Sequence, residues 1–167
     1  MLKMYHDYEH DNLNNYLNVA RAAALKAGVI LKEHFGKICP SMVNEKATND
    51  YVTVVDRTSE DIIKEHIKSH FKNHDIMAEE SLAERNSSRF LWIIDPLDGT
   101  MNYIHGLPSF AVSIALAIEG NLAMGLIYEP LRDIIYSAMR GHGSFKNDKR
   151  IHVSSSETLS TALIATG

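Results

Sequence analysis

The sequence is poor in cysteine, in positive charge and in long apolar runs, and each shortage excludes a class of protein. Its single cysteine, Cys39, cannot form an intrachain disulfide, so we expect a protein of the reducing cytoplasm rather than a disulfide-stapled domain. A formal net charge of −4 provides no basic field for nucleic acid. No apolar run approaches the roughly 20 residues that cross a bilayer, and residues 1–10 lack a signal-peptide core. Neither a nucleic-acid nor a membrane partner is expected.

The composition otherwise belongs to an ordinary globular protein. Hydrophobic residues make up 45% and charged residues 23% of the 167-residue chain, a balance typical of folded domains. A chain of this length has room for one domain and buries roughly 70% of its unfolded surface. We therefore expect one domain with a sizeable core.

Apolar residues repeat at three- and four-residue steps in the first half of the chain. From about Asp11 to Phe35 this periodicity predicts a long helix closed by Gly36. A second helix is predicted to begin at Asp56, whose side chain suits an N-cap, and to run to about Lys72. The alanine-rich face of the first helix favours close packing on the second.

Short apolar segments bounded by turn residues predict strands in the rest of the chain. Helices followed by a run of hairpins favour an α+β fold, a layered sandwich in which two long helices pack on one face of a mostly antiparallel sheet. The expected strands are 50–56, 74–80, 91–94, 110–118, 122–128, 133–140, 144–145 and 159–165, with a polar loop at 44–50 and a polar connector or small lid at 82–89.

The most informative stretch begins where an apolar strand ends on a carboxylate, Asp95. Pro96 holds Asp95 extended, and Asp98 follows three residues later, close enough to share a cation with it. Gly99 and Thr100 then open a short segment whose free amides, if it is helical, form an anion site. Two carboxylates beside an anion site suit a phosphate ester bound with magnesium. Alternatively, Asp98–Gly99 is the turn of a hairpin.

Two further pairs of residues are candidate ligands. Glu79 and Glu80 end a predicted strand, and because adjacent strand residues face opposite ways, only one of them can reach Asp95. The pattern does not say which one. His66 and His70 lie four apart on the second predicted helix, a spacing that can hold zinc, but without a third ligand we interpret them as the boundary of an amphipathic face.

The stretch after residue 91 resembles the signature of the inositol monophosphatase family of metal-dependent, lithium-sensitive phosphatases. The similarity covers Asp95-Pro96-Leu97-Asp98-Gly99-Thr100, then Asn102-Tyr103, and the apolar residues on either side. Residues 50–56 resemble the family's Asp-x-x-Thr-x-x-Asp element. Residues 78–81 resemble its Gly-Glu-Glu-Ser element, with alanine in place of the glycine. The resemblance covers essentially the whole chain, but only the first half of a family member.

The resemblance implies a site for two magnesium ions. Glu79, Asp95 and the backbone carbonyl of Leu97 would hold the first ion, and Asp95 and Asp98 would share the second. Such a grouping of carboxylates favours a divalent cation, since two like charges at ~4 Å repel by about 4 kcal/mol at an effective dielectric constant of 20. Ligands that are all oxygens select magnesium over zinc or copper.

For catalysis, the resemblance implies a water molecule that attacks phosphorus after being oriented by Thr100 and Glu79. In the family, the aspartate that corresponds to Asp56 bonds the threonine that corresponds to Thr100. The amides of Gly99 and Thr100 would bind phosphate oxygens, and Asp98 would contact the substrate. The chemistry would rest on positioning and charge neutralisation.

The implied activity is hydrolysis of inositol monophosphate or a related small polyol phosphate by a homodimer. Fructose bisphosphate, NADP and 3′-phosphonucleotides are alternative substrates for the same chemistry. In the family a second domain supplies another metal-binding aspartate and most substrate-selecting residues, so residues 1–167 would form the N-terminal metal- and phosphate-binding domain. We expect this chain alone to hydrolyse phosphate esters poorly. A non-catalytic metal-binding or dimerising half-domain is the alternative class.

Overall fold

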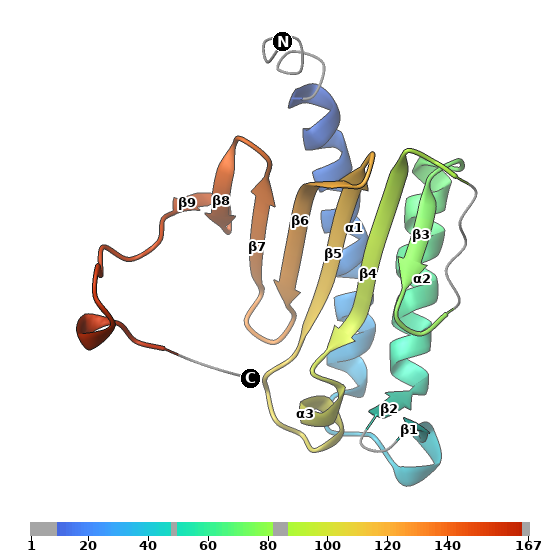
Figure 1. Cartoon of the computed structure of the whole chain (residues 1–167). Helices are drawn as coiled ribbons and strands as arrows, with labels where there is room; N and C mark the ends of the chain where they lie inside the picture. The colour runs from blue at the N-terminus through green and yellow to red at the C-terminus, as the bar shows by residue number, and fades with distance from the viewer. Residues whose placement is uncertain (1–9, 48–49, 82–86, 165–167) are drawn as a thin grey trace.

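The computed structural model describes residues 10–47, 50–81 and 87–164. Two long helices precede most of the strands, and one short helix interrupts the chain near its middle (Figure 1). The elements in chain order are α1 (His10–His34), η1 (Pro40–Met42), β1 (Val43–Ala47), β2 (Asp50–Thr53), α2 (Val54–His70), β3 (Asp75–Ala78), β4 (Phe90–Asp98), α3 (Thr100–Ile104), β5 (Ala111–Ile118), β6 (Asn121–Glu129), β7 (Ile134–Met139), β8 (Gly143–Lys146), β9 (Lys149–Ile151) and η2 (Leu159–Thr161).

Seven strands form one sheet in the order β3-β4-β5-β6-β7-β8-β9. The β3–β4 pair is parallel, and every other neighbouring pair of this sheet is antiparallel. Helices α1 and α2 lie side by side on one face of the sheet (Figure 1). The predicted α+β fold, with two long helices on a mostly antiparallel sheet, is therefore confirmed. Among the described helices, none has the length and apolar character needed to cross a membrane.

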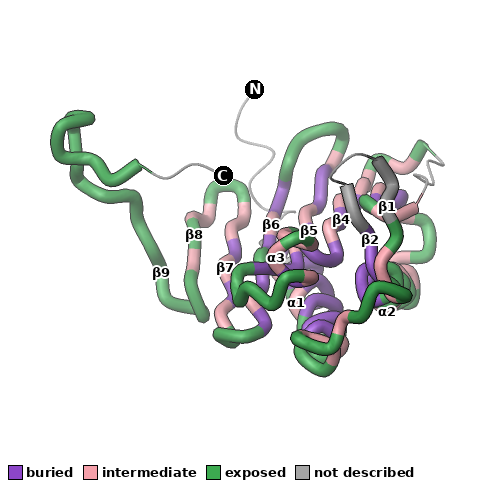
Figure 2. The backbone as a smooth tube through the Cα atoms, turned by 90° about the horizontal axis from the view of Figure 1, so that it is seen from below, coloured by how far each residue is buried: buried purple, intermediate pink, exposed green. Residues whose placement is uncertain are grey.

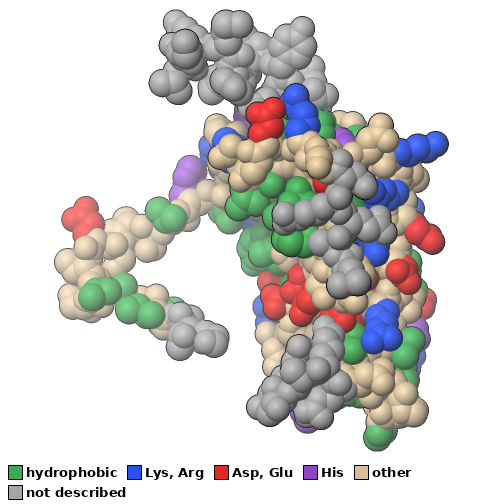
Figure 3. All heavy atoms as spheres, turned by 45° about the vertical axis from the view of Figure 1, so that its right-hand side comes forward, with side chains coloured by type: hydrophobic (Ala, Val, Ile, Leu, Met, Phe, Trp, Pro, Cys, Tyr) green, Lys and Arg blue, Asp and Glu red, His purple; other side chains and the backbone are tan. Residues whose placement is uncertain are grey.

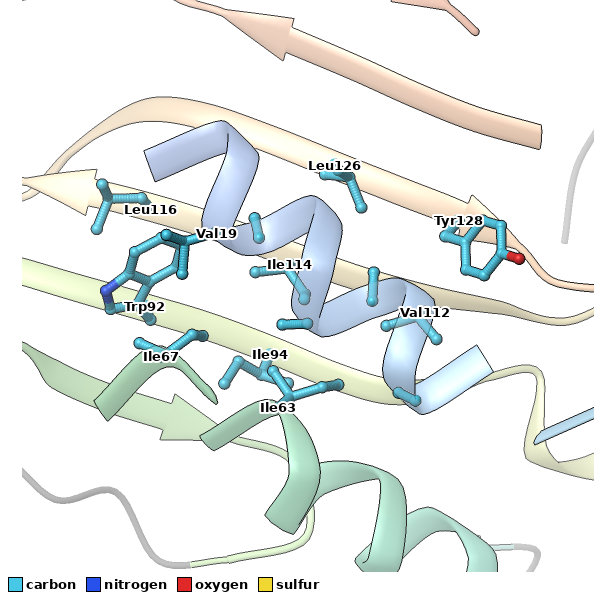
Figure 4. Close-up of a cluster of buried hydrophobic side chains, with 14 of the residues drawn as sticks. Val19, Ile63, Ile67, Trp92, Ile94, Val112, Ile114, Leu116, Leu126 and Tyr128 are labelled. Carbon is cyan, nitrogen blue, oxygen red and sulfur yellow. The ribbon is translucent and has the colours of Figure 1, made fainter. Parts of the chain in front are cut away.

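The core lies between the helices and the sheet, where the buried residues concentrate (Figure 2). Four alanines of α1 have no exposed surface, so this helix approaches α2 and the strands closely. Large side chains of α2 and of the inner face of β4, β5 and β6 fill the remaining space (Figure 4). Each contributes about 1.5–3 kcal/mol by leaving water. They include Ile63, Ile67, Trp92, Ile94, Val112, Ile114, Leu116, Leu126 and Tyr128.

The ends of the two long helices were predicted with different success. Gly36 follows α1 with φ +73°, a conformation that glycine adopts without strain. The prediction of Asp56 as the N-cap of α2 is wrong, because Thr53 holds that position. The Thr53 side chain accepts from the Val55 and Asp56 amides, and the Asp56 carboxylate accepts from the Thr53 amide at 3.0 Å. Asp56 is thus the second partner of a capping box.

Several strand predictions also need correction. Residues 43–47 form β1, paired antiparallel with β2, so the polar loop predicted at 44–50 is wrong over most of its length. Polar composition did not prevent pairing because both strands lie in the same hairpin. Residues 159–161 form the 3₁₀ turn η2 rather than a strand. They lie on an exposed tail that leaves the sheet after β9 and has no strand beside it (Figure 2). Residues 82–86 of the predicted connector lie outside the described residues.

Candidate metal and phosphate site

The parallel strands β3 and β4 bring Glu79 beside Asp95. Their register pairs Ala78 with Ile94, and the Glu79 amide donates to the Ile94 carbonyl at 3.2 Å. β3 ends at Ala78, two residues earlier than predicted, so Glu79 begins the turn that follows. Of the two glutamates that the pattern left open, Glu79 is hydrogen-bonded to Asp95.

Asp95 lies among neighbouring carboxylates that make its ionisation costly. Burial is the largest cause that raises its pKa, to about 7, followed by the charge and hydrogen bond of Glu79 and then by the charge of Asp98. Figure 3 shows a group of acidic side chains on the face of the molecule that this view presents. A bound cation would offset the like charge of Glu79 and Asp98 that helps to raise this pKa.

A break in the β4–β5 ladder shapes the backbone between the two aspartates. The register shifts between Asp95 and Asp98, as in a β-bulge, and Pro96 contributes no amide donor there. The Leu97 amide donates to Asp95 Oδ1 at 3.1 Å, and the Leu97 carbonyl accepts from the Thr100 hydroxyl at 3.0 Å. The Leu97 carbonyl therefore faces the same loop as the Thr100 side chain.

Gly99 turns the chain from β4 into α3, so the alternative of a hairpin at Asp98–Gly99 is wrong. Gly99 has φ +89°, and a Cβ built on it would lie 2.9 Å from the Ser109 carbonyl oxygen. The Asn102 side chain donates to the same carbonyl at 2.8 Å. Buried Tyr103 donates from its hydroxyl to the Leu31 carbonyl of α1 at 2.8 Å. The short helix is thus fixed to the loop at 109 and to α1.

Replacing Gly99 with alanine should disturb this turn. The left-handed φ costs an L side chain roughly 1–2 kcal/mol, and the added Cβ would press on backbone that cannot rotate away. We expect the midpoint of urea unfolding to fall measurably. Gly120→Ala is the matched control, since Gly120 has φ +78° but no atom within 4 Å of a built Cβ. Equal losses in the two variants would show that the contact with Ser109 contributes nothing.

Asp56 connects α2 to the start of α3. Thr100 donates from its hydroxyl to Asp56 Oδ1 at 3.1 Å, the contact that the family resemblance implied. The other carboxylate oxygen accepts from the Thr53 hydroxyl. Burial raises the pKa of Asp56, while its hydrogen bonds with Thr53 and Thr100 oppose that shift. The Asp56 carboxylate can therefore orient the Thr100 hydroxyl so that its proton points at Asp56. The lone pairs of the Thr100 oxygen then remain available to another group.

Glu60 is a positioning residue that the sequence analysis missed. It is 2% exposed, and its Oε2 accepts from the Glu80 amide at 2.7 Å. Lys64 lies 3.7 Å from Glu60 Oε1 and donates to the Ser81 hydroxyl at 3.0 Å. These contacts from α2 hold the turn that carries Glu79. A signal was present, because Glu60 and Asp56 interrupt the apolar face that α2 otherwise buries through Ile63 and Ile67.

Replacing Glu60 with alanine should loosen the turn after β3. The change removes the Glu60 acceptor from the partly buried Glu80 amide, and the loss of such a bond costs up to about 1–3 kcal/mol, so the midpoint of urea unfolding should fall. The neighbouring exposed carboxylate offers a control, Asp61→Ala, which should leave the free energy of unfolding within about 0.5 kcal/mol of that of the parent. Backbone amide exchange at Glu79 and Glu80 should accelerate only in Glu60→Ala. Unchanged exchange there would remove Glu60 from this role.

The two histidines singled out in the sequence make other contacts. The rings of His66 and His70 lie 4.7 Å apart, with His66 Nδ1 2.9 Å from the Lys26 ammonium and His70 Nδ1 2.9 Å from the His66 carbonyl. Among the described residues, no group of three or more His, Cys, Asp or Glu side chains is close enough to enclose a metal ion as they stand. The carboxylates of Glu79 and Asp95 meet, whereas Asp98 is exposed and reaches Asp95 only through its charge.

Comparison with known proteins decides the family. The profile of the inositol monophosphatase family matches residues 12–167. The chain belongs to the inositol monophosphatase family. The resemblance drawn from the motif is therefore confirmed.

Relatives within the family carry two kinds of name. The chain is 45% identical over 157 residues to a protein of Aquifex aeolicus named fructose-1,6-bisphosphatase/inositol-1-monophosphatase, covering 94% of this chain and 60% of that protein. It is 40% identical over 156 residues to the Nus factor SuhB of Pasteurella multocida, covering 93% and 58%. The chain thus spans about 60% of the length of these relatives.

Solved structures of the family share the fold described above. The extragenic suppressor protein suhB from Bartonella henselae superimposes with a TM-score of 0.82 at 40% identity, over 85% of this chain and 55% of that one. The inositol monophosphatase from Anabaena superimposes with a TM-score of 0.74 at 38% identity, over 87% and 52%. The similarity therefore covers nearly all of this chain.

The residues of this family member suit a hard divalent cation. The pKa of Asp95 is raised to about 7 partly because Glu79 and Asp98 surround it with like charge, which a bound cation would neutralise. The nearby donors are carboxylate and carbonyl oxygens, with no thiolate or imidazole among the residues assigned to the site. Such a donor set favours magnesium, manganese or calcium over zinc.

Proposed function

We propose that this protein is a magnesium-dependent phosphomonoesterase of small polyol or sugar phosphates, with inositol monophosphate as the leading substrate. In this proposal residues 1–167 form its N-terminal metal- and phosphate-binding domain. The observation that carries the proposal is the group of Glu79, Asp95 and Asp98 next to the Thr100–Asp56 hydrogen bond. Family membership and the names of the relatives support it.

Four residues would hold the metal. Glu79, Asp95 and the Leu97 carbonyl would bind one Mg²⁺, and Asp98 would join Asp95 on a second. When bound, such ions lower the pKa of a coordinated water and neutralise charge that develops on phosphate oxygens. The Leu97 carbonyl already accepts from the Thr100 hydroxyl, and its second lone pair is open to a cation.

Thr100 and Glu79 would position the attacking water. The Thr100 hydroxyl has one proton, which Asp56 Oδ1 and the Leu97 carbonyl share, so its oxygen lone pairs can accept a hydrogen bond from the water. The Glu79 carboxylate would accept the water's other hydrogen bond. Oriented in this way, the water would direct its oxygen at phosphorus along the line of the bond that breaks.

The first turn of α3 would bind the phosphate. The first hydrogen bond of this helix runs from the Tyr103 amide to the Gly99 carbonyl at 3.0 Å, so the helix does not use the amides of Gly99 and Thr100. These two amides would donate to phosphate oxygens, and Asp98 would contact the substrate beside them. The missing Cβ of Gly99 lets the backbone approach a ligand closely.

In this proposal the protein works in the cytoplasm as a homodimer, without a nucleic-acid or membrane partner. Its net charge of −4 repels nucleic acid, and the site can hold a small ester. Fructose 1,6-bisphosphate remains a second candidate substrate because a relative at 45% identity carries that name beside inositol monophosphatase.

Phosphate release tests the proposal. The chain is assayed on inositol 1-phosphate, fructose 1,6-bisphosphate, NADP and a 3′-phosphonucleotide, either with excess Mg²⁺ or with EDTA. We expect release only with Mg²⁺, highest on inositol phosphate, and lost in Thr100→Val. Release that persists in EDTA would contradict the metal-dependent mechanism.

A further inference from the structure

His74 is enclosed by aromatic rings at the entrance to β3. The Phe71 ring stacks on it with centroids 4.8 Å apart and planes 9° apart, and the Phe90 ring with centroids 4.2 Å apart and planes 11° apart. Tyr16 of α1 meets the His74 ring at 5.8 Å. Helix α1, the residue that follows α2 and strand β4 therefore each place an aromatic ring against this imidazole.

Within this stack His74 accepts a partly buried hydrogen bond. The indole Nε1–H of Trp92, a side chain with no exposed surface, donates to His74 Nδ1 at 3.1 Å. Indole nitrogen can only donate, so His74 Nδ1 must be unprotonated and the ring proton must lie on Nε2. A proton on Nδ1 would set two donors against each other and leave the indole N–H without an acceptor.

The charges that face His74 come from three parts of the chain. Lys68 of α2 donates to the His74 carbonyl at 2.8 Å and its charge disfavours the imidazolium, whereas Asp75 of β3 favours it. Arg89, immediately before β4, lies over the Phe90 ring at 4.9 Å. The phenol of Tyr16 stays neutral because burial raises its pKa, although Arg89 opposes this. Burial is the largest cause that lowers the pKa of His74, followed by Lys68.

The bond lies at one end of the parallel strand pair whose other end carries the candidate site. Ile76 pairs with Trp92, and the same register places Glu79 beside Asp95. A one-residue slip would turn every side chain of β3 to the opposite face. The side-chain bond from Trp92 to His74 therefore closes only in the register that also joins the two carboxylates.

We propose that the His74–Trp92 hydrogen bond is a proton-sensitive clasp on the β3–β4 pair, closed when His74 is neutral and opened when it is protonated. The unfolded chain binds a proton at His74 near pH 6.5, and the folded chain binds it only at lower pH. The stability contributed by the clasp is therefore complete above about pH 6.5. It declines as the pH falls from there towards the folded pKa.

The sole tryptophan of the chain reports on the clasp directly. Its single indole N–H resonance is followed by ¹H–¹⁵N NMR from pH 7.5 to 5.0 (a range that spans the usual pKa of histidine), together with the His74 ring carbon resonances. We expect the indole signal to move upfield and broaden along the His74 titration, with a midpoint below 6.5. An indole signal that stays constant while His74 titrates would overturn the proposal.

Two variants separate the clasp from other titrating groups. His74→Phe keeps an aromatic ring between Phe71 and Phe90 but neither accepts nor titrates, so its indole resonance should lie upfield at all pH values and lose the His74-linked shift. His74→Gln offers a neutral acceptor and should keep the downfield position across the range. The control His152→Phe, at an exposed position on the tail, should behave as the parent. A pH-dependent shift retained in His74→Phe would assign the effect to another group.

Discussion

Replacing Asp95 with asparagine should abolish magnesium binding. Asp95 is the proposed ligand that both ions share, and it is the carboxylate on which the charges of Glu79 and Asp98 converge. Asparagine keeps an oxygen for the Leu97 amide, so the β4 bulge should persist. We expect calorimetric titration to show an affinity at least roughly 100-fold weaker than that of the parent, the order of effect seen when one electrostatic partner of a reactive centre is removed.

Urea unfolding of Asp95→Asn shows whether the variant loses magnesium because a metal-binding side chain is missing or because the protein no longer folds. At pH 8 the parent carries an ionised carboxylate that burial and two neighbours destabilise, so the neutral amide should unfold at the same urea concentration or a higher one. Asp61→Asn, an exposed change on α2, should leave both affinity and stability unchanged. Magnesium affinity that is the same in Asp95→Asn and the parent would remove Asp95 from the site.

Residues 1–167 alone should hydrolyse inositol phosphate at least ~10²-fold more slowly than a full-length family member at saturating magnesium. The proposed first ion finds its protein ligands in Glu79, Asp95 and Leu97. Among the described residues, the proposed second ion has Asp95 and Asp98 as ligands, and we expect its remaining ligand in the part of the relatives that this chain does not match. That ion would stabilise the leaving group, so its weak binding should lower turnover more than substrate affinity.

The comparison is made with the two proteins side by side, by phosphate release at several magnesium concentrations. Turnover that is equal in both would show that these residues contain the whole catalytic machinery. We expect the rate of residues 1–167 to saturate with magnesium in one step, and that of the full-length relative in two steps. Such a difference would support a first ion site with all its protein ligands in this chain and a second site that lacks one.

The parts of the fold with a local cause were predictable from the sequence. The 3.6-residue periodicity of α1 and α2 and the hairpin of β5 and β6 around Gly120 are encoded by residues close together in the chain, and the structure confirms them. The cap of α2 was also local, since Thr53 and Asp56 have the spacing of a capping box. It was misassigned because aspartate at the third helical position is itself a good N-cap residue.

The parts that depend on distant contacts were not predictable from pattern alone. Glu60 holds the amide of Glu80, 20 residues away, and nothing in the α2 periodicity indicates that partner. The bond from Thr100 to Asp56 spans 44 residues and was expected only through the family resemblance. Conversely, the apolar residues of 159–165 predicted a strand, but a strand needs a neighbour to pair with, and no described strand lies beside residues 159–164.

The most direct test of the central claim is to locate the cation. Manganese(II) shares the preference of magnesium for carboxylate oxygens, and it broadens the NMR signals of nuclei near it. Added below one equivalent to the ¹⁵N-labelled chain, it should broaden the amides of Glu79 and of residues 95–100 first, and excess Mg²⁺ should restore them. Broadening that begins instead at His66 and His70, with the signals of residues 95–100 unchanged, would contradict a metal site at Asp95.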